Sequence, residues 1–285
     1  MSLHTLSEWL RCPICLTPLT AFEPLLLRCE HGHSFDVNKR GFVTMLRSHG
    51  LIGDSAAMLD ARASFLNAGW YAPLLDAVST LSTQQDPADV LDIGCGTGYY
   101  LGGVLERSPA ARALAFDISP AAVSRTVRSH PHVDGLVADV WSALPIRGNS
   151  ADLILNVFAP RNAAEFARIL RPDGLMIVVI PQDSHLRELR DTGLALGVQQ
   201  NKATQLVDSL ADHFAVESRQ KLDVRMDLTQ AEIMSLVGMG PSAHHQGETP
   251  ERGDDADNDA GHRQVVTAAF EIFGFRPRHT SPAAQ

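Results

Sequence analysis

Short apolar runs alternate with amphipathic segments through the middle of the chain. The runs are apolar at consecutive positions, which is typical of parallel strands that are buried on both faces of a sheet. This alternation predicts a doubly wound α/β domain whose ligand lies at the carboxyl ends of the strands. The predicted strands are 90–93, 113–117, 135–139, 152–158 and 175–180, and the helices between them are 99–107, one opened by Ser119 and Pro120, and 162–170.

The pattern is less regular on both sides of this core. Residues 54–82 are predicted to be helical with a division at Pro73, whereas residues 1–48 contain no long periodic segment. We therefore expect a small module at 1–48, a helical linker at 49–84 and an α/β domain at 85–285 with seven strands in its sheet. Beyond Pro181 the pattern predicts helices near 183–195, 202–212 and 229–237 and strands near 214–227 and 264–272.

The run V-L-D-I-G-C-G-T-G at 90–98 places three glycines directly after a predicted strand. Gly94, Gly96 and Gly98 lack a Cβ, so the backbone can turn tightly and approach a ligand. A dinucleotide loop, G-x-G-x-x-G, would need glycine where the chain has Tyr99, and no Lys-Ser/Thr pair follows to make a phosphate-binding loop. The run resembles motif I of the S-adenosylmethionine-dependent methyltransferases, in which the glycine loop lies under the methionine part of the cofactor.

Acidic residues end three consecutive predicted strands. Asp92 precedes the glycine loop and can bind the ammonium group of methionine, and Asp117 can accept both ribose hydroxyls. Asp139, with Val140, is expected beside the adenine. One aspartate at a strand end is more often a helix cap, but three of them in register with the glycine loop favour a cofactor site. We interpret Cys95, inside the loop, as a packing residue.

Three of the four cysteines lie in the first 29 residues, in the pattern C-x2-C-x13-C-x3-H. Cys12, Cys15, Cys29 and His33 have the spacing of a structural zinc site, and four protein ligands leave no open position for catalysis. His31 is an alternative fourth ligand, although C-x-H makes a tighter loop. A module this small has little core, so zinc is expected to supply much of its folding energy.

Composition limits the choice of function only weakly. The chain has 285 residues, 45% of them hydrophobic, with no apolar run near the ~20 residues that span a bilayer and no N-terminal secretory signal. So few cysteines in a long chain indicate a reducing compartment, the cytoplasm. The net charge of -9 argues weakly against a nucleic-acid partner. However, six acidic residues fall within 248–259, inside a polar stretch at 246–262 that is predicted to be a mobile loop.

The segment N-V-F-A-P-R-N at 156–162 follows the fourth of the core strands, where methyltransferases place residues that face the substrate. It lacks the N/D-P-P-Y/F motif of exocyclic amino methylation, which weighs against an adenine-N6 enzyme. A ring nitrogen such as guanine N1 carries a proton that must leave near or during transfer. The sequence does not identify the group that takes this proton; Asn156 and Asp54 are the candidates.

Taken together, the motifs resemble the bacterial 23S rRNA guanine-N1 methyltransferases of the RlmA type. They look most like the Gram-positive branch that includes the tylosin- and mycinamicin-resistance methyltransferases. Trp70 stands where the family usually has a histidine. The resemblance rests on the zinc module followed by G-D-S-A-A-M (53–58), A-R-A-S-F-L-N-A-G-W-Y (61–71), the glycine loop, A-D-V-W (138–141), N-V-F-A-P-R-N and M-G-P-S (239–242).

The resemblance implies methylation of a guanine in hairpin 35 of 23S rRNA, of the guanine 748 type, and a connection with macrolide resistance. It implies S-adenosylmethionine as the methyl donor, one structural zinc held by the four residues above, and cofactor contacts from Tyr71, Gly96, Thr97 and His185. It also implies a homodimer whose two zinc modules form a cleft for the hairpin. We expect basic side chains of the module to bind RNA phosphates: Arg11, Arg28, Lys39 and Arg40.

Two other functions are compatible with these motifs. A small-molecule methyltransferase could use the zinc hairpin only as a lid. RNA binding would weaken steeply with ionic strength, whereas small-molecule turnover would not. A non-catalytic, cofactor-binding regulator would transfer no methyl group to ribosomal RNA.

Overall fold

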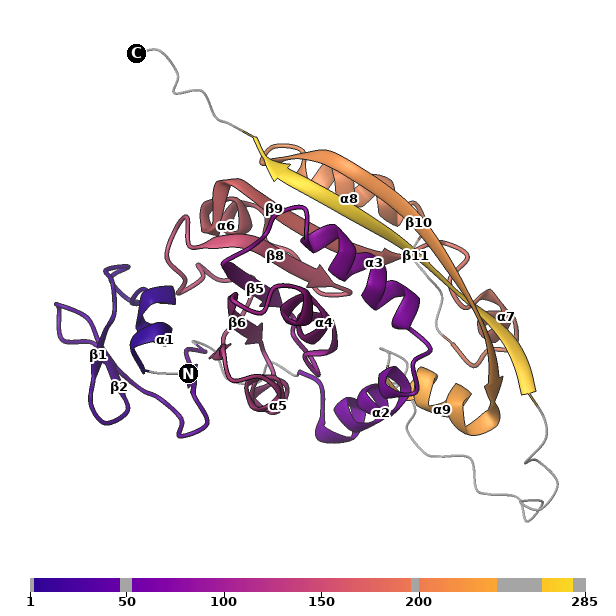
Figure 1. The fold of residues 1–285 in the computed structure, drawn as a ribbon, viewed down its shortest axis with the longest axis horizontal. Helices are drawn as coiled ribbons and strands as arrows, with labels where there is room; N and C mark the ends of the chain where they lie inside the picture. The colour runs from indigo at the N-terminus through magenta and orange to yellow at the C-terminus, as the bar shows by residue number, and fades with distance from the viewer. Residues whose placement is uncertain (1–2, 47–52, 196–199, 240–262, 279–285) are drawn as a thin grey trace.

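The structure, a computed structural model, describes residues 3–46, 53–195, 200–239 and 263–278 (Figure 1). The described helices are α1 (Leu3–Trp9), α2 (Ala56–Asn67), α3 (Ala72–Ser82), α4 (Tyr99–Arg107), α5 (Pro120–Ser129), α6 (Ala163–Ile169), α7 (Arg187–Asp191), α8 (Lys202–Leu210) and α9 (Gln230–Gly238). The described strands are β1 (Thr20–Phe22), β2 (Leu26–Arg28), β3 (Ser34–Asp36), β4 (Phe42–Thr44), β5 (Asp89–Ile93), β6 (Arg112–Asp117), β7 (Val133–Val137), β8 (Ala151–Val157), β9 (Leu170–Pro181), β10 (Phe214–Thr229) and β11 (Arg263–Pro277).

A large sheet organises the molecule, with strand order β10-β11-β9-β8-β5-β6-β7-β4. The six strands β9, β8, β5, β6, β7 and β4 are parallel to one another. Strand β11 is antiparallel to both β9 and β10. The chain runs from β5 outward to β7 and then returns to β8, so the order reverses between β5 and β8. Ligands of doubly wound sheets bind outside the carboxyl ends of the strands at such a point. The predicted α/β class and the position of the glycine loop at this point are confirmed.

The large sheet has eight strands where the sequence pattern predicted seven. The additional strand is β4, which lies within 1–48 and pairs in parallel with β7. Phe42 is buried on one face of the sheet and Val43 on the other, so β4 contributes to both core clusters. A Cβ at Gly135 would lie 2.5 Å from the Cβ of Phe42, so the glycine in β7 makes room for this strand. The expected domain boundary at 48 therefore follows a strand of the large sheet.

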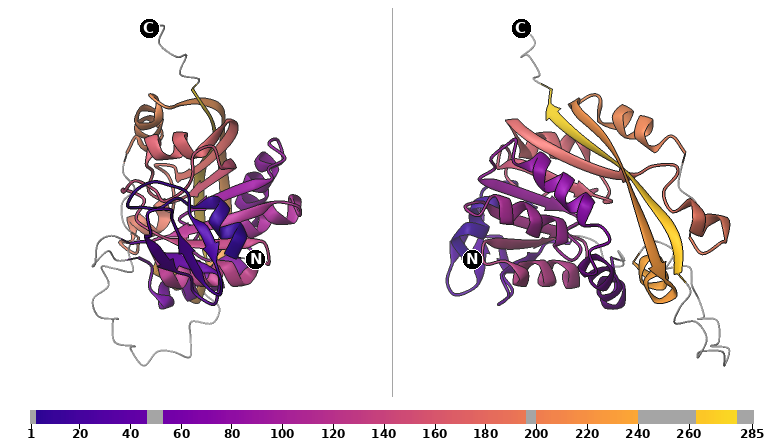
Figure 2. Two further views of the ribbon diagram at one scale, coloured as in Figure 1. Left: turned by 90° about the vertical axis from the view of Figure 1, so that its left-hand side faces the viewer. Right: turned by 45° about the vertical axis from the view of Figure 1, so that its right-hand side comes forward.

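Helices cover the large sheet on both faces (Figure 2). Consecutive strand residues point to opposite cores: Ala113 and Ala115 belong to one cluster, Leu114 and Phe116 to the other. Buried residues of α3, α4 and α5 pack on the first face, and those of α1, α6 and α8 on the second. The three-stranded antiparallel sheet β1-β2-β3 joins the second face through buried residues such as Leu27. The N-terminal segment is therefore attached to the α/β domain by packing.

The C-terminal elements agree with the predicted types and differ in length. Helix α7 has only five residues where a helix was predicted over 183–195, and β9 begins five residues before the predicted strand. Strands β10 and β11 pair from Phe214 and Pro277 to Thr229 and Arg263, well past the end of the pairing between β11 and β9. The predicted loop at 246–262 and most of the M-G-P-S segment lie outside the described residues. No helix in the described ranges combines the length and apolar character needed to cross a membrane.

Candidate functional site

The glycine loop connects β5 to α4. Gly94, Gly96 and Gly98 have φ angles of +79°, +52° and +78°, a backbone conformation that residues with a Cβ rarely adopt. A Cβ at Gly94 would lie 2.5 Å from the Cβ of Ala159. The glycines therefore allow the turn itself and also the close approach of the loop that follows β8.

Two carboxylates lie behind the glycine loop. Asp92 is 4% exposed, and burial, together with the charge of Asp117, raises its pKa to about 7. Asp117 accepts hydrogen bonds from the N–H groups of Gly96 (3.1 Å) and Ser119 (2.9 Å), while burial raises its pKa. A cation or a set of donors placed beside these groups would stabilise their ionised forms.

Asp139 and Val140 follow β7 at the same edge of the sheet. Oδ1 of Asp139 accepts a hydrogen bond from the Trp141 N–H at 3.0 Å, so the carboxylate also shapes the local turn. Val140 is buried, and its carbonyl accepts a hydrogen bond from Nδ2 of Asn162 at 2.9 Å. The structure thus brings the third acidic strand end to the edge that carries Asp92 and Asp117.

Tyr71 and His185 are far apart in sequence, and both contact the ring of Phe270. The ring centroids of Tyr71 and Phe270 are 4.9 Å apart, and those of His185 and Phe270 are 5.1 Å apart. Nδ1 of His185 lies 3.1 Å from the Ala269 carbonyl, and burial lowers the pKa of the imidazole to about 4. His185 is therefore neutral at pH 7 and can offer a hydrogen bond without a charge.

Arg62 reaches over the glycine loop from α2. Its Nη1 forms an ion pair with Asp54, and its Nη2 donates to the Met239 carbonyl at 2.8 Å. A Cβ at Gly96 would lie 3.1 Å from Nη1 of Arg62, so the guanidinium rests directly on the loop. Asp54, a candidate base, is here the partner that holds this arginine. Arg62 was not among the residues predicted for the site, although it lies eight residues after Asp54 in the segment A-R-A-S-F-L-N-A-G-W-Y at 61–71.

The residues at this edge fit S-adenosylmethionine. The hydroxyl of Tyr100 is buried without a hydrogen-bond partner in the described part of the chain, although buried hydroxyls normally have one. The glycines leave space over the backbone, Asp92 can face an ammonium group and Asp117 can face ribose hydroxyls. Thr97, half-buried within the loop, adds a hydroxyl. This set of donors and acceptors matches an amino-acid nucleoside better than a phosphate.

Asn156, the other candidate base, is fully buried at the end of β8. Its Nδ2 donates to the Pro160 carbonyl at 3.0 Å, and its Oδ1 accepts from Nη1 of Arg161 at 3.3 Å. Both ends of the amide therefore hold the loop at 156–162 in shape.

Cys12, Cys15, Cys29 and His33 come together, with one ligand atom from each within 4.8 Å of the others. The Sγ atoms of Cys15 and Cys29 are 3.6 Å apart, and Nδ1 of His33 lies 3.4 Å from Cys29 Sγ. Tetrahedral zinc with Zn–S bonds of about 2.3 Å would separate two thiolates by roughly 3.8 Å. His31 is exposed and lies outside the cluster. The donor set and its spacing fit a structural zinc ion.

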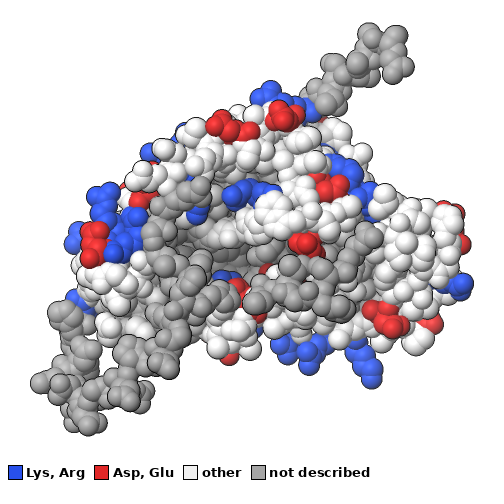
Figure 3. Space-filling model, turned by 180° about the vertical axis from the view of Figure 1, so that it is seen from behind, with Lys and Arg blue, Asp and Glu red and all other residues white. Residues whose placement is uncertain are grey.

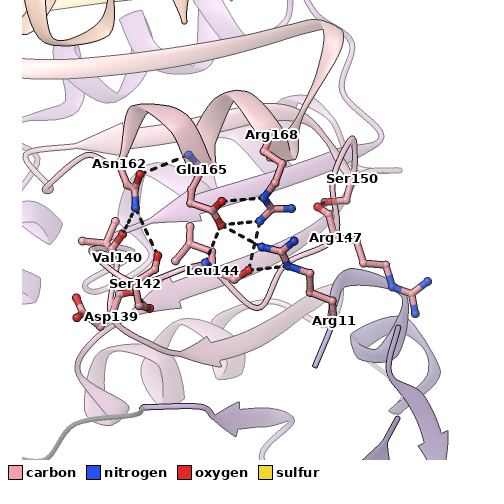
Figure 4. A network of polar contacts seen from close by, with 10 residues as sticks. All are labelled: Arg11, Asp139, Val140, Ser142, Leu144, Arg147, Ser150, Asn162, Glu165 and Arg168. Atoms are coloured by element: carbon pink, nitrogen blue, oxygen red, sulfur yellow. Dashed lines mark hydrogen bonds and ion pairs between the residues drawn. The ribbon is translucent and has the colours of Figure 1, made fainter. Parts of the chain in front are cut away.

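Arg11 connects the zinc-binding segment to the α/β domain (Figure 4). Its Nη2 lies 3.3 Å from Oε2 of Glu165 in α6, and its Nε donates to the Leu144 carbonyl at 3.0 Å. Arg168 pairs with the same carboxylate at 2.7 Å. The charge of Arg11 is therefore engaged inside the molecule. The other predicted RNA-binding side chains, Arg28, Lys39 and Arg40, are exposed.

Comparisons with known proteins agree with both parts of this site. Residues 10–49 match the family model described as "RlmA, N-terminal", a zinc ribbon, and residues 90–174 match "Methyltransferase domain". The chain is 43% identical over 244 residues to the 23S rRNA (guanine(748)-N(1))-methyltransferase of Streptomyces fradiae, covering 84% of this chain and 87% of that protein.

A second relative, from Micromonospora griseorubida, is 39% identical over 288 residues, which cover 94% of this chain and 97% of the relative; it is provisionally named a 23S rRNA (guanine-N1)-methyltransferase. The fold and the two sites define a methyltransferase with an N-terminal zinc ribbon. The chain belongs to the 23S rRNA (guanine-N1)-methyltransferase family. The methyltransferase domain implies S-adenosylmethionine as cofactor, and the zinc ribbon with its cluster implies one structural zinc.

Proposed function

We propose that this protein methylates N1 of a guanine in hairpin 35 of 23S rRNA, of the guanine 748 type. The observation that carries the proposal is the joining, in one chain, of a Cys3His cluster and a methyltransferase glycine loop. A relative whose name states this activity is 43% identical to this chain. A modification at the peptide exit tunnel would lower susceptibility to macrolides such as tylosin and mycinamicin.

The proposed cofactor site uses the carboxyl edge of the large sheet. S-adenosylmethionine supplies an electrophilic methyl group on a positively charged sulfur. Asp92 holds the ammonium group, Asp117 accepts the ribose hydroxyls, and Asp139 with Val140 borders the adenine. The linker at 49–84 covers this site through Arg62 and Tyr71. The remaining contacts come from the glycine loop, with Gly94, Gly96, Thr97 and Gly98, and from His185.

The proposed RNA surface is the N-terminal module at 1–48. Arg28, Lys39 and Arg40 are exposed there and are free of carboxylate partners among the described residues. On the face shown in Figure 3, basic and acidic groups are interspersed over the described residues. We therefore assign RNA selection to a homodimer whose two modules grip the hairpin together. The substrate, ribosomal RNA, places the protein in the cytoplasm.

Primer extension on 23S rRNA tests the function directly. RNA from a strain without this activity is incubated with the zinc-loaded protein and S-adenosylmethionine. A methyl group on N1 blocks Watson–Crick pairing, so reverse transcriptase stops one nucleotide before the target in hairpin 35. A salt series separates the alternatives, because RNA methylation falls steeply with ionic strength and small-molecule turnover does not. The absence of a stop in hairpin 35 at low salt refutes the proposal.

A further inference from the structure

The loop at 156–162 lies against the place where the methyl donor is expected. Ala159 in this loop packs on Gly94, where a Cβ would approach within 2.5 Å. Asn156, buried at the end of β8, holds the loop from inside through Pro160 and Arg161. Side chains of this loop are therefore within reach of a base presented to the cofactor.

Arg161 is a half-buried cation without an acidic partner in the described residues. Its Nη1 donates to two neutral oxygens, Oδ1 of Asn156 at 3.3 Å and the Ala159 carbonyl at 3.0 Å. Its Nε and Nη2 donate to no acceptor in the described chain. By contrast, the partly buried Arg112 and Arg171 are both paired with carboxylates. A half-buried guanidinium with two unused nitrogen atoms is costly unless an anion or a strong acceptor binds to it.

A second cation that has no carboxylate partner among the described residues interacts electrostatically with Arg161. Lys202, at the start of α8, is half-buried, and burial together with the charge of Arg161 lowers its pKa. Lys202 in turn contributes, with Arg190, to the low pKa of His185, so these groups are near one another. Arg161 and Lys202 thus bring two positive charges to this place in an acidic chain.

Phe158 offers a stacking surface in the same loop. It is 45% exposed and adopts a φ of +57°, a strained conformation for an aromatic residue that tends to occur at functional sites. Its ring centroid lies 5.6 Å from that of Phe270, which also contacts His185 and Tyr71. Phe158, three residues before Arg161 in the same loop, therefore packs against the residue that contacts both His185 and Tyr71.

We propose that Arg161, supported by Lys202, binds the O6 and N7 edge of the target guanine, and that Phe158 stacks on the base. Arginine commonly binds guanine through these two acceptors, whereas adenine has a donor at position 6. This inference rests on the proposed function and identifies how the base is chosen and activated. Asn156 is then a positioning residue for Arg161.

The same contact assists the chemistry. When the N1–H bond breaks, the proton passes to solvent and negative charge spreads to O6, where the guanidinium stabilises it. The N1 electron pair forms the new N–CH3 bond, and the C–S bond of the donor breaks with its electron pair remaining on sulfur. Arg161 therefore makes the N1 of the bound guanine more acidic. Without it, the methylation rate should depend more strongly on pH and should rise as the pH rises.

Single-turnover methylation of a hairpin 35 transcript at pH 6 to 10 tests this inference, with zinc-loaded full-length protein in excess. Arg161→Gln should react about 10²- to 10³-fold more slowly at pH 7. Its deficit should shrink as the pH rises, because hydroxide then removes the proton that Arg161 helps to release. The methylation rate of Arg161→Lys should lie between those of the wild type and Arg161→Gln. Cofactor affinity, measured by calorimetry, should change less than threefold.

Two controls make the outcome specific. Arg128→Gln, at an exposed arginine whose Nε donates only to its own helix α5, should behave as wild type. A transcript with 6-thioguanosine at the target, whose N1 is more acidic, should reduce the deficit of Arg161→Gln. A wild-type rate, or an equal loss at every pH, overturns the role of Arg161. Failure of the wild-type protein to methylate N1 refutes the proposed function instead.

Discussion

Arg11 in the zinc-binding segment and Glu165 in α6 form an ion pair, with 3.3 Å between Nη2 and Oε2, and about 15% of each side chain is exposed. Glu165 also accepts the N–H of Leu144 at 2.7 Å, in the loop that follows Asp139 and Val140. The caps of α6, the turn beside the proposed adenine site and the zinc-binding segment are therefore one hydrogen-bonded unit.

Removing this connection should destabilise the protein. Arg11→Ala leaves the partly buried Glu165 with Arg168 as its remaining cation, so we expect a loss of about 1 to 2 kcal/mol in the free energy of unfolding. Arg40→Ala, at an exposed arginine that donates to Ser124, should change it by less than about 0.5 kcal/mol. Urea denaturation of the zinc-loaded proteins measures both. Equal stabilities of the two variants would contradict the structural role of Arg11.

Zinc removal should unfold the zinc-binding segment from Cys12 to Asp36 and leave the cofactor domain, including β4, folded. The cluster consists of Cys12, Cys15, Cys29 and His33, so the wild-type protein should contain one zinc per chain. Cys29→Ser should lose the metal. Cys95→Ser should keep it, because Cys95 is buried in the glycine loop away from the cluster. Metal analysis and hydrogen exchange measure these outcomes; a chelator that leaves exchange in this region unchanged would refute the assignment.

Cofactor affinity should depend on pH through Asp92. Burial raises the pKa of this carboxyl to about 7 in the protein without cofactor, so the group is increasingly protonated below that pH. An ammonium group prefers the ionised form, and affinity should fall up to tenfold per unit as the pH drops from 7 to 5. Asp92→Asn should bind more weakly at pH 8 and lose this dependence. Calorimetric titration measures the cofactor affinity of both proteins. If both showed the same dependence on pH, Asp92 would be excluded as the source of that dependence.

The raised pKa of Asp92 also makes the stability of the folded protein depend on pH. Because the folded-state pKa of Asp92 lies above the unfolded value, its contribution is fully present below about pH 4 and is lost as the pH rises through 7. Without cofactor, Asp92→Asn should therefore be more stable than wild type at pH 8, by up to about 4 kcal/mol. At pH 4 the two proteins should be nearly equally stable. Thermal unfolding at the two pH values provides the comparison.

Gly94→Ala should prevent correct packing of the two loops. Gly94 and Gly193 have similar φ angles, +79° and +76°, but a Cβ at Gly193 would meet nothing within 4 Å. Gly193→Ala thus reports the backbone strain alone, about 1 kcal/mol. Gly94→Ala adds the clash with Ala159 and should destabilise the protein by at least ~2 kcal/mol more. Equal effects in urea denaturation would show that the close approach of the loops does not matter.

Long periodic segments and closely spaced motifs were predictable from the sequence. The strands from 90 to 180, the glycine loop and the zinc spacing all depend on neighbours in the chain. Strand β4 was not predictable, because three residues are too few to show an alternation, and its place in the large sheet is set by Gly135. The short helix α1 was missed for a similar reason. Local sequence patterns therefore predicted the core of the α/β domain. They did not predict β4 and α1, which join the N-terminal segment to it.

Charges were harder to assign than the backbone. Arg11 counted as a candidate for RNA binding until the structure placed it against Glu165, 154 residues away. Arg161 was not predicted to be a site residue, because the sequence does not show which arginines have an acidic partner. Arg62 was overlooked for the opposite reason, since its contacts with Asp54, Gly96 and Met239 depend on how α2 packs. Pairing of side chains is non-local, and only the fold decides it.

Transfer of a methyl group to guanine N1 in 23S rRNA is the activity proposed for this protein. Its most direct test is mass spectrometry of the hairpin 35 fragment, excised from rRNA that was treated with the zinc-loaded protein and S-adenosylmethionine. We expect one added methyl group, released on digestion as 1-methylguanosine and absent when Asp92→Asn is used at low cofactor concentration. An unmodified fragment, or a methyl group on any other atom, would contradict it.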